Sequence, residues 1–147
     1  MKISILVCAV ALGCGSAAAD TTADTLHDLM VLEHRAMDGW RDGNPEPALA
    51  VFDPDVTYFH VMTEKRLDGL AAVKELFEKY RGMPLFESYE ILEPRVQAAG
   101  DVAVLTYRFV RHARGEAGQF NVTQVYQRKK EGWRVIHSHF SARTIQP

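Results

Sequence analysis

Apolar residues in the N-terminal part of the chain recur every three to four positions. Over residues 25–40 they fall on one side of a wheel drawn at about 100° per residue, which predicts an amphipathic helix. Asp24 is a suitable N-cap and Gly43 a suitable end. A short second helix is expected over residues 48–52. The apolar positions of the first helix are Leu26, Leu29, Met30, Ala36, Met37 and Trp40.

The pattern changes after a third helix, which Asp68 caps and Gly82 ends. Its apolar positions, Leu70, Val73, Phe77 and Tyr80, again repeat at threes and fours. β-Branched and aromatic runs predict strands at residues 56–62, 86–98, 102–112, 119–129 and 133–141. Short turns join the last four, so these strands should pair antiparallel. The order predicts one α+β domain, with the helices on one face of a curved antiparallel sheet.

The first 19 residues have the layout of a secretory signal peptide. A positive start at Lys2 precedes an apolar run over residues 3–12, and the small residues 17–19 offer a cleavage site after Ala19. We therefore expect a periplasmic or secreted protein whose mature domain is 20–147. Lipidation at Cys14 is the less favoured alternative, because Ala11 is a poor residue at the upstream position of a lipobox.

The amino-acid composition argues against several classes of function. The chain has 17 basic and 19 acidic side chains, which argues against a nucleic-acid binder built on bulk positive charge. Both cysteines, Cys8 and Cys14, precede the expected cleavage site, so the mature domain would have no disulfide or thiol nucleophile. No run after Asp20 is long and apolar enough to predict a membrane span.

Glu33 is the most informative single residue, because it lies on the apolar side of the first helix. A buried acid is costly unless it is paired, hydrogen-bonded or facing a cavity. One interpretation is a structural bond to backbone or to an arginine. The other is a pocket carboxyl, whose pKa burial would raise toward general acid–base use.

Histidines supply the other candidate chemistry. Tyr58 and His60 are two apart on a strand and share one face, so His60 could work with Glu33 as an acid–base pair. His137 and His139 share a face in the same way, but a zinc site needs a third protein ligand, and we expect no metal.

A small basic cluster lies near the end of a predicted hairpin. It consists of Arg111, His112 and Arg114. We interpret it as a solvated turn.

Several motifs resemble the nuclear transport factor 2-like superfamily. They match the SnoaL-like, ketosteroid isomerase-like branch that includes the association domain of calcium/calmodulin-dependent protein kinase II. The motifs are Phe52-Asp53-Pro54-Asp55-Val56-Thr57-Tyr58-Phe59, Leu67-Asp68-Gly69, Pro94 with Gly100-Asp101, Val125-Tyr126, and the more specific run Gly132-Trp133-Arg134-Val135-Ile136-His137-Ser138-His139-Phe140-Ser141.

This resemblance implies a cone-shaped roll, in which three N-terminal helices pack on a strongly curved sheet that encloses a pocket. It also implies self-association as a dimer or larger ring, with the sheet face that holds Val125, His137 and His139 as the contact surface. Strand-by-strand matching places Ile136 on the pocket face and puts Phe109, Gln124 and Phe140 where the kinase domains have anion-binding arginines. The expected ligand-binding residues are Trp40, Tyr58, Tyr107, Phe109, Gln124, Tyr126, Ser138 and Phe140.

These observations favour an exported domain that binds a small hydrophobic or aromatic molecule. Glu33 or His60 would move a proton in an isomerase-, cyclase- or dehydratase-type reaction. No cofactor is expected, because proton transfer next to a carbonyl needs only a placed base and an electrostatic partner. The alternative is a non-catalytic self-association or adaptor module.

Overall fold

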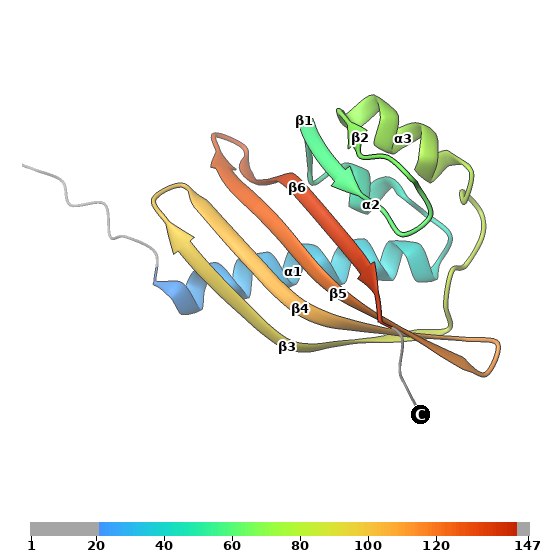
Figure 1. The fold of residues 1–147 in the computed structure, drawn as a ribbon. Coiled ribbons are helices and arrows are strands. Elements are labelled where there is room, and N and C mark those ends of the chain that lie inside the picture. Colours follow the sequence, from blue (N-terminus) through green and yellow to red (C-terminus); the bar gives the residue numbers. More distant parts are fainter. Residues whose placement is uncertain (1–20, 144–147) are drawn as a thin grey trace, which may run out of the picture.

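The computed structural model describes residues 21–143, which form helices packed on a six-stranded sheet (Figure 1). The α+β class is confirmed. The expected signal segment, with Ala19 and Cys14, lies outside the described residues. The helices are α1 (Thr22–Arg41), α2 (Glu46–Leu49) and α3 (Leu70–Glu78). The strands are β1 (Phe52–Phe59), β2 (Leu67–Asp68), β3 (Ser88–Ala99), β4 (Val102–Ala113), β5 (Glu116–Lys129) and β6 (Gly132–Ala142).

The sheet has the strand order β2-β1-β6-β5-β4-β3. Strands β3 to β6 form the expected antiparallel meander. Strand β1 lies parallel to β6, so the sheet is mixed, whereas the sequence predicted antiparallel pairing. No short turn joins β1 to β6, and nothing in the local sequence therefore fixes their relative direction.

Several helix boundaries differ from the prediction. Helix α3 has Gly69 instead of Asp68 as its N-cap and ends at Glu78, before Gly82. Helix α1 begins at Thr22, because Thr21 is its N-cap and forms a capping box with Asp24. Asp24 thus lies inside the first turn instead of capping the helix. Helix α2 ends at Leu49, and β1 already begins at Phe52, four residues before the expected strand.

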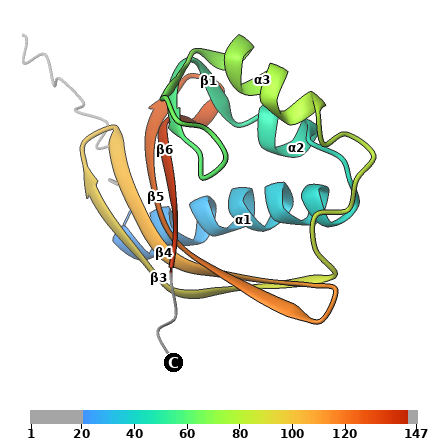
Figure 2. The ribbon, with the colours of Figure 1, turned by 45° about the vertical axis from the view of Figure 1, so that its right-hand side comes forward.

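The sheet bends around α1, which lies along its concave side (Figure 2). Two irregularities mark the long strands: β3 shifts register between Leu92 and Arg95, and the β5–β6 pairing shifts between Val125 and Tyr126. Bulges of this kind bend and twist a strand locally. The concave face and α1 enclose most of the buried apolar side chains, Leu29, Val122 and Val135 among them.

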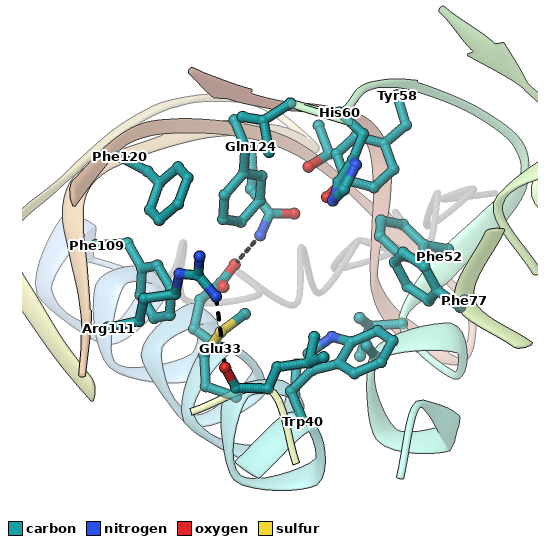
Figure 3. Close-up of a pocket in the computed structure, with 18 of the residues that line it drawn as sticks. Glu33, Trp40, Phe52, Tyr58, His60, Phe77, Phe109, Arg111, Phe120 and Gln124 are labelled. Atoms are coloured by element: carbon teal, nitrogen blue, oxygen red, sulfur yellow. Dashed lines mark hydrogen bonds between the residues drawn. The ribbon is translucent and has the colours of Figure 1, made fainter. Parts of the chain in front are cut away.

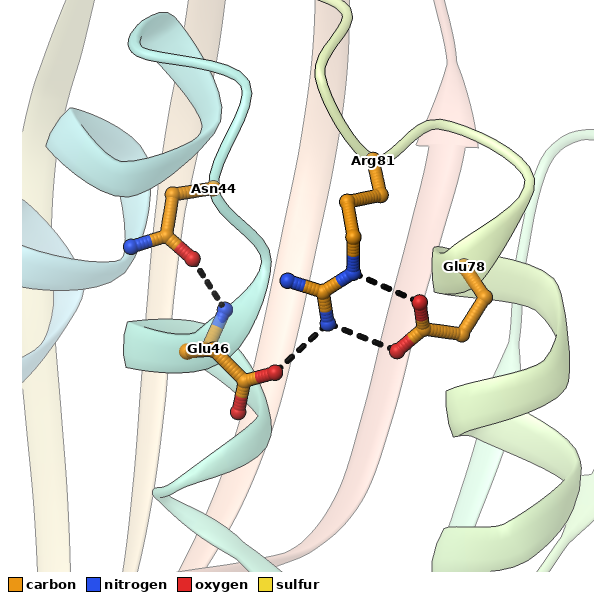
Figure 4. Close-up of polar contacts among 4 residues, drawn as sticks. All are labelled: Asn44, Glu46, Glu78 and Arg81. Atoms are coloured by element: carbon orange, nitrogen blue, oxygen red, sulfur yellow. Dashed lines mark hydrogen bonds and ion pairs between the residues drawn. The ribbon is translucent and has the colours of Figure 1, made fainter.

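Helices α2 and α3 lie beside each other above one end of α1 (Figures 1 and 2). Arg81 connects them, because its guanidinium donates to Glu78 at 2.6 and 2.7 Å and to Glu46 at 2.5 Å (Figure 4). The backbone N–H of Glu46 also donates to Asn44. Exposed ion pairs each contribute little stability. Their structural effect is to join the two helices that close one end of the concave side.

Candidate functional site

Glu33 of α1 points at the concave face of the sheet and is only 1% exposed. The Tyr107 hydroxyl on β4 donates to its Oε2 at 2.7 Å. The Gln124 amide on β5 donates to Oε1 at 2.7 Å (Figure 3). The Tyr126 hydroxyl, also on β5, donates to the same oxygen. The carboxylate thus has side-chain donors in place of the backbone or arginine partner considered above, and it also lines a cavity.

Burial sets the acid–base properties of this cluster. Loss of solvation raises the pKa of Glu33 above its ordinary value, and the three hydrogen bonds oppose that rise only in part. Burial and the nearby Glu33 charge also raise the pKa of Tyr107 and of Tyr126. Both phenols therefore stay protonated at neutral pH and act as donors, while Glu33 is the group that can gain or lose a proton.

The cavity beside Glu33 has a volume of about 280 Å³ and mainly apolar walls (Figure 3). Helix α1 contributes Glu33 and Trp40 to its wall, α3 contributes Phe77, and strands and loops contribute further side chains. Trp40 meets Phe77 edge to face at 4.8 Å between ring centroids. A concave apolar site with few polar groups suits a small, mainly apolar molecule.

Most residues expected to bind a ligand lie on this wall. They are Trp40, Tyr58, Phe109, Gln124, Tyr126, Ser138 and Phe140. Tyr107 does not line the cavity, and its hydroxyl donates to Glu33. Its role is to hold the carboxylate. Other lining residues, which the sequence did not indicate as ligand-binding, include Leu32, Met37, Phe52, Phe77, Phe86 and Phe120.

On strand β6, the structure differs from the prediction at Ile136. Ile136 was expected on the cavity face, but the register shift pairs Tyr126 with Val135 and leaves Ile136 as the extra residue. Val135 is fully buried, and Ile136 does not line the cavity. His137 and His139 also lie off the cavity wall and contact the Phe59 ring.

His60 lines the cavity but is not among the hydrogen-bond partners of Glu33. The backbone N–H of Met62 donates to its Nδ1 at 3.1 Å. Nδ1 must then carry a lone pair, so the neutral ring carries its proton on Nε2. Burial lowers the pKa of His60 and favours this neutral form. Glu33 and His60 therefore line the same cavity, but no hydrogen bond connects them directly.

Arg111 corrects the interpretation of the basic cluster. It lies in β4 and lines the cavity instead of a solvated turn (Figure 3). Its guanidinium lies 5.6 Å from the centre of the Phe120 ring and donates to the Leu85 carbonyl at 3.5 Å. Of the other two members, His112 bonds Glu90, and Arg114 follows the strand.

Residues 21–143 contain neither a candidate metal site nor a candidate membrane-spanning helix. No group of three or more histidine, cysteine, aspartate or glutamate side chains in this range is arranged to hold a metal ion. None of the helices in this range has the length and apolar character needed to cross a membrane.

Comparison with known families identifies the chain. The sequence model of the SnoaL-like domain matches residues 18–145. The chain belongs to the SnoaL-like domain family. This confirms the resemblance to the nuclear transport factor 2-like superfamily. A search of curated proteins finds no match.

Solved structures share the fold of this SnoaL-like chain. A nuclear transport factor 2-like protein of unknown function from Pseudomonas putida is 24% identical, with a TM-score of 0.74 over 84% of this chain and 90% of that one. A candidate ketosteroid isomerase from Parabacteroides distasonis is 24% identical, with a TM-score of 0.71 over 80% and 86%. The kinase II hub of S. rosetta is 22% identical, with a TM-score of 0.66 over 80% and 95%.

Proposed function

We propose that this SnoaL-like domain binds a small, mainly apolar molecule in its cavity and that Glu33 exchanges a proton with that molecule. The observation that carries the proposal is a buried carboxylate on the wall of an apolar cavity, held there by three side-chain donors. Groups that combine desolvation with a fixed position in a cleft are typical of acid–base sites.

The geometry suits proton transfer of the isomerase, cyclase or dehydratase type. As carboxylate, Glu33 accepts a proton from a carbon next to an electron-withdrawing group and returns it at a second position. The hydrogen bonds from Tyr107 and Tyr126 hold the carboxylate in one orientation. The neutral His60 offers its Nε2–H as a donor on the same cavity wall.

Binding of 1-naphthol tests the cavity directly, because this probe is an aromatic molecule of suitable size. Ala36 lies on α1 and lines the cavity, so Ala36→Leu should fill it and lower the affinity about tenfold or more. Ala71→Leu makes the same change on the exposed face of α3 and should leave the affinity unchanged. Isothermal titration calorimetry measures both. Equal affinities for the two variants would contradict a ligand site in this cavity.

We propose self-association as a second function, because the outer face of the sheet exposes an aromatic surface. Phe59 is 44% exposed and contacts His137 and His139 there. Similar structures include a kinase II hub from S. rosetta and a kinase II hub homology domain from Chlamydomonas reinhardtii. Sedimentation velocity of the chain from Asp20 onward should show a dimer or larger species, and a monomer at micromolar concentration would contradict this second proposal.

A further inference from the structure

Three polar side chains form a row across the concave face of the sheet. Tyr58 on β1 is in register with Ser138 on β6, and Ser138 is in register with Gln124 on β5. Directly paired residues on neighbouring strands point to the same face and lie about 5 Å apart at their Cβ atoms. All three side chains line the cavity. They interrupt walls that are otherwise mainly apolar.

Each member of this row has unused hydrogen-bonding capacity. The Gln124 Oε1 and the Ser138 Oγ are buried and have no hydrogen-bond partner in the described part of the chain. The Tyr58 hydroxyl makes no hydrogen bond there either, but its oxygen is not among the fully buried unpaired atoms. Buried polar groups are almost always paired in folded proteins, because leaving one unpaired costs free energy. Two buried unpaired oxygens beside an unpaired hydroxyl indicate a place where a ligand supplies the missing partners.

The Gln124 amide determines which kind of partner is needed. Its Nε2 donates to the Glu33 carboxylate, and a flipped amide would set Oε1 against that negative charge. Oε1 is therefore restricted to accepting, and the ligand must bring an O–H or N–H donor. The Ser138 and Tyr58 hydroxyls can each donate or accept. A ligand hydroxyl fits this pattern, since it donates to Gln124 and accepts from one of its neighbours.

We infer that Tyr58, Ser138 and Gln124 recognise the hydroxyl of an otherwise apolar ligand, so that the substrate or product class is a phenol, an enol or an alcohol. This inference rests on the proposed function of the cavity. A ketone or ether has no proton to give to Gln124. Neighbouring side chains cover both the Gln124 and the Ser138 oxygens. Binding therefore includes a small rotation of one or both side chains toward the ligand.

A matched pair of probes tests the row. 1-Naphthol and 1-methoxynaphthalene share the aromatic body, but only the former has a hydroxyl. Calorimetry should show that the wild-type chain binds 1-naphthol about tenfold more tightly, the contribution of about one neutral hydrogen bond. Ser138→Ala and Tyr58→Phe each remove one oxygen, and the variant that removes the hydroxyl donating to the ligand should bring this ratio closer to one.

Trp133→Phe is the control, because the Trp133 Nε1 is also buried without a partner but does not line the cavity. This variant should keep the wild-type ratio. Ser138→Ala should melt at the same temperature as the wild type or higher, since it removes an unpaired buried hydroxyl. A loss of the ratio in that variant therefore does not arise from unfolding.

The outcomes separate the two proposals. If both probes bind the wild-type chain equally and Ala36→Leu weakens both, the cavity site stands and hydroxyl recognition is wrong. If Ser138→Ala and Tyr58→Phe both keep the wild-type ratio, the assignment to this row is wrong. If neither probe binds, the proposed function and the inference that rests on it both fail.

Discussion

Replacing Glu33 with leucine should lower the free energy of unfolding by about 3 kcal/mol. Leucine fills a similar volume but accepts no hydrogen bond. The change leaves the Tyr107 and Tyr126 hydroxyls and one Gln124 N–H without an acceptor in a buried site. An unpaired buried donor costs about 1–3 kcal/mol, and removal of the desolvated charge offsets part of the total. Urea denaturation at neutral pH measures the difference.

The same physical argument predicts that removing the orphaned donors restores the stability that Glu33→Leu loses. Adding Tyr107→Phe and Tyr126→Phe to Glu33→Leu removes two of the three orphaned donors, so most of the lost stability should return. Glu75→Leu, on the exposed face of α3, makes the same substitution without burial and should change stability by less than about 0.5 kcal/mol. A Glu33→Leu chain as stable as wild type would show that the carboxylate is not the acceptor for these donors.

Helical periodicity is enough to show that Glu33 points inward. Its partners could not be predicted in the same way, because Tyr107, Gln124 and Tyr126 lie 74, 91 and 93 residues along the chain. The contacts depend on how far the sheet bends around α1. Local patterns do not contain that curvature, and only the resemblance to a known family implied it.

Two predictions for side chains on the sheet, at Arg111 and Ile136, were wrong for different reasons. Arg111 continues the alternation of Leu105, Tyr107 and Phe109, so a strict period of two would have placed it on the inner face. The charge of Arg111 and its position near a turn led instead to the prediction that it faces solvent. The predicted placement of Ile136 was wrong because it assumed unbroken alternation along β6. The bulge on this strand interrupts that alternation.

Replacing Glu33 with glutamine should abolish base chemistry while keeping the fold. The glutamine carbonyl can accept from Gln124 and Tyr126, and its amide can donate to the Tyr107 oxygen, so stability should change by about 1 kcal/mol at most. A suitable probe is 5-nitrobenzisoxazole. Removal of its ring C–H proton by a base breaks the N–O bond and releases a coloured cyanophenolate. The variant should be slower than wild type by about 100-fold or more.

Glu75→Gln provides the control for this experiment, since Glu75 is exposed and lies away from the cavity wall. It should react at the wild-type rate. If Glu75→Gln were as slow as Glu33→Gln, the loss would come from a general effect on the chain instead of the cavity carboxylate.

The rate of this elimination as a function of pH, in wild type and in Glu33→Gln, tests the central claim most directly. Only the carboxylate form of Glu33 is a base, so the wild-type rate should rise as pH passes through the pKa of the folded state. Because burial raises that pKa, the rise should be centred above the ordinary value of 4.5, and the variant should lack it. Equal rates for both chains at every pH would contradict a catalytic role for Glu33.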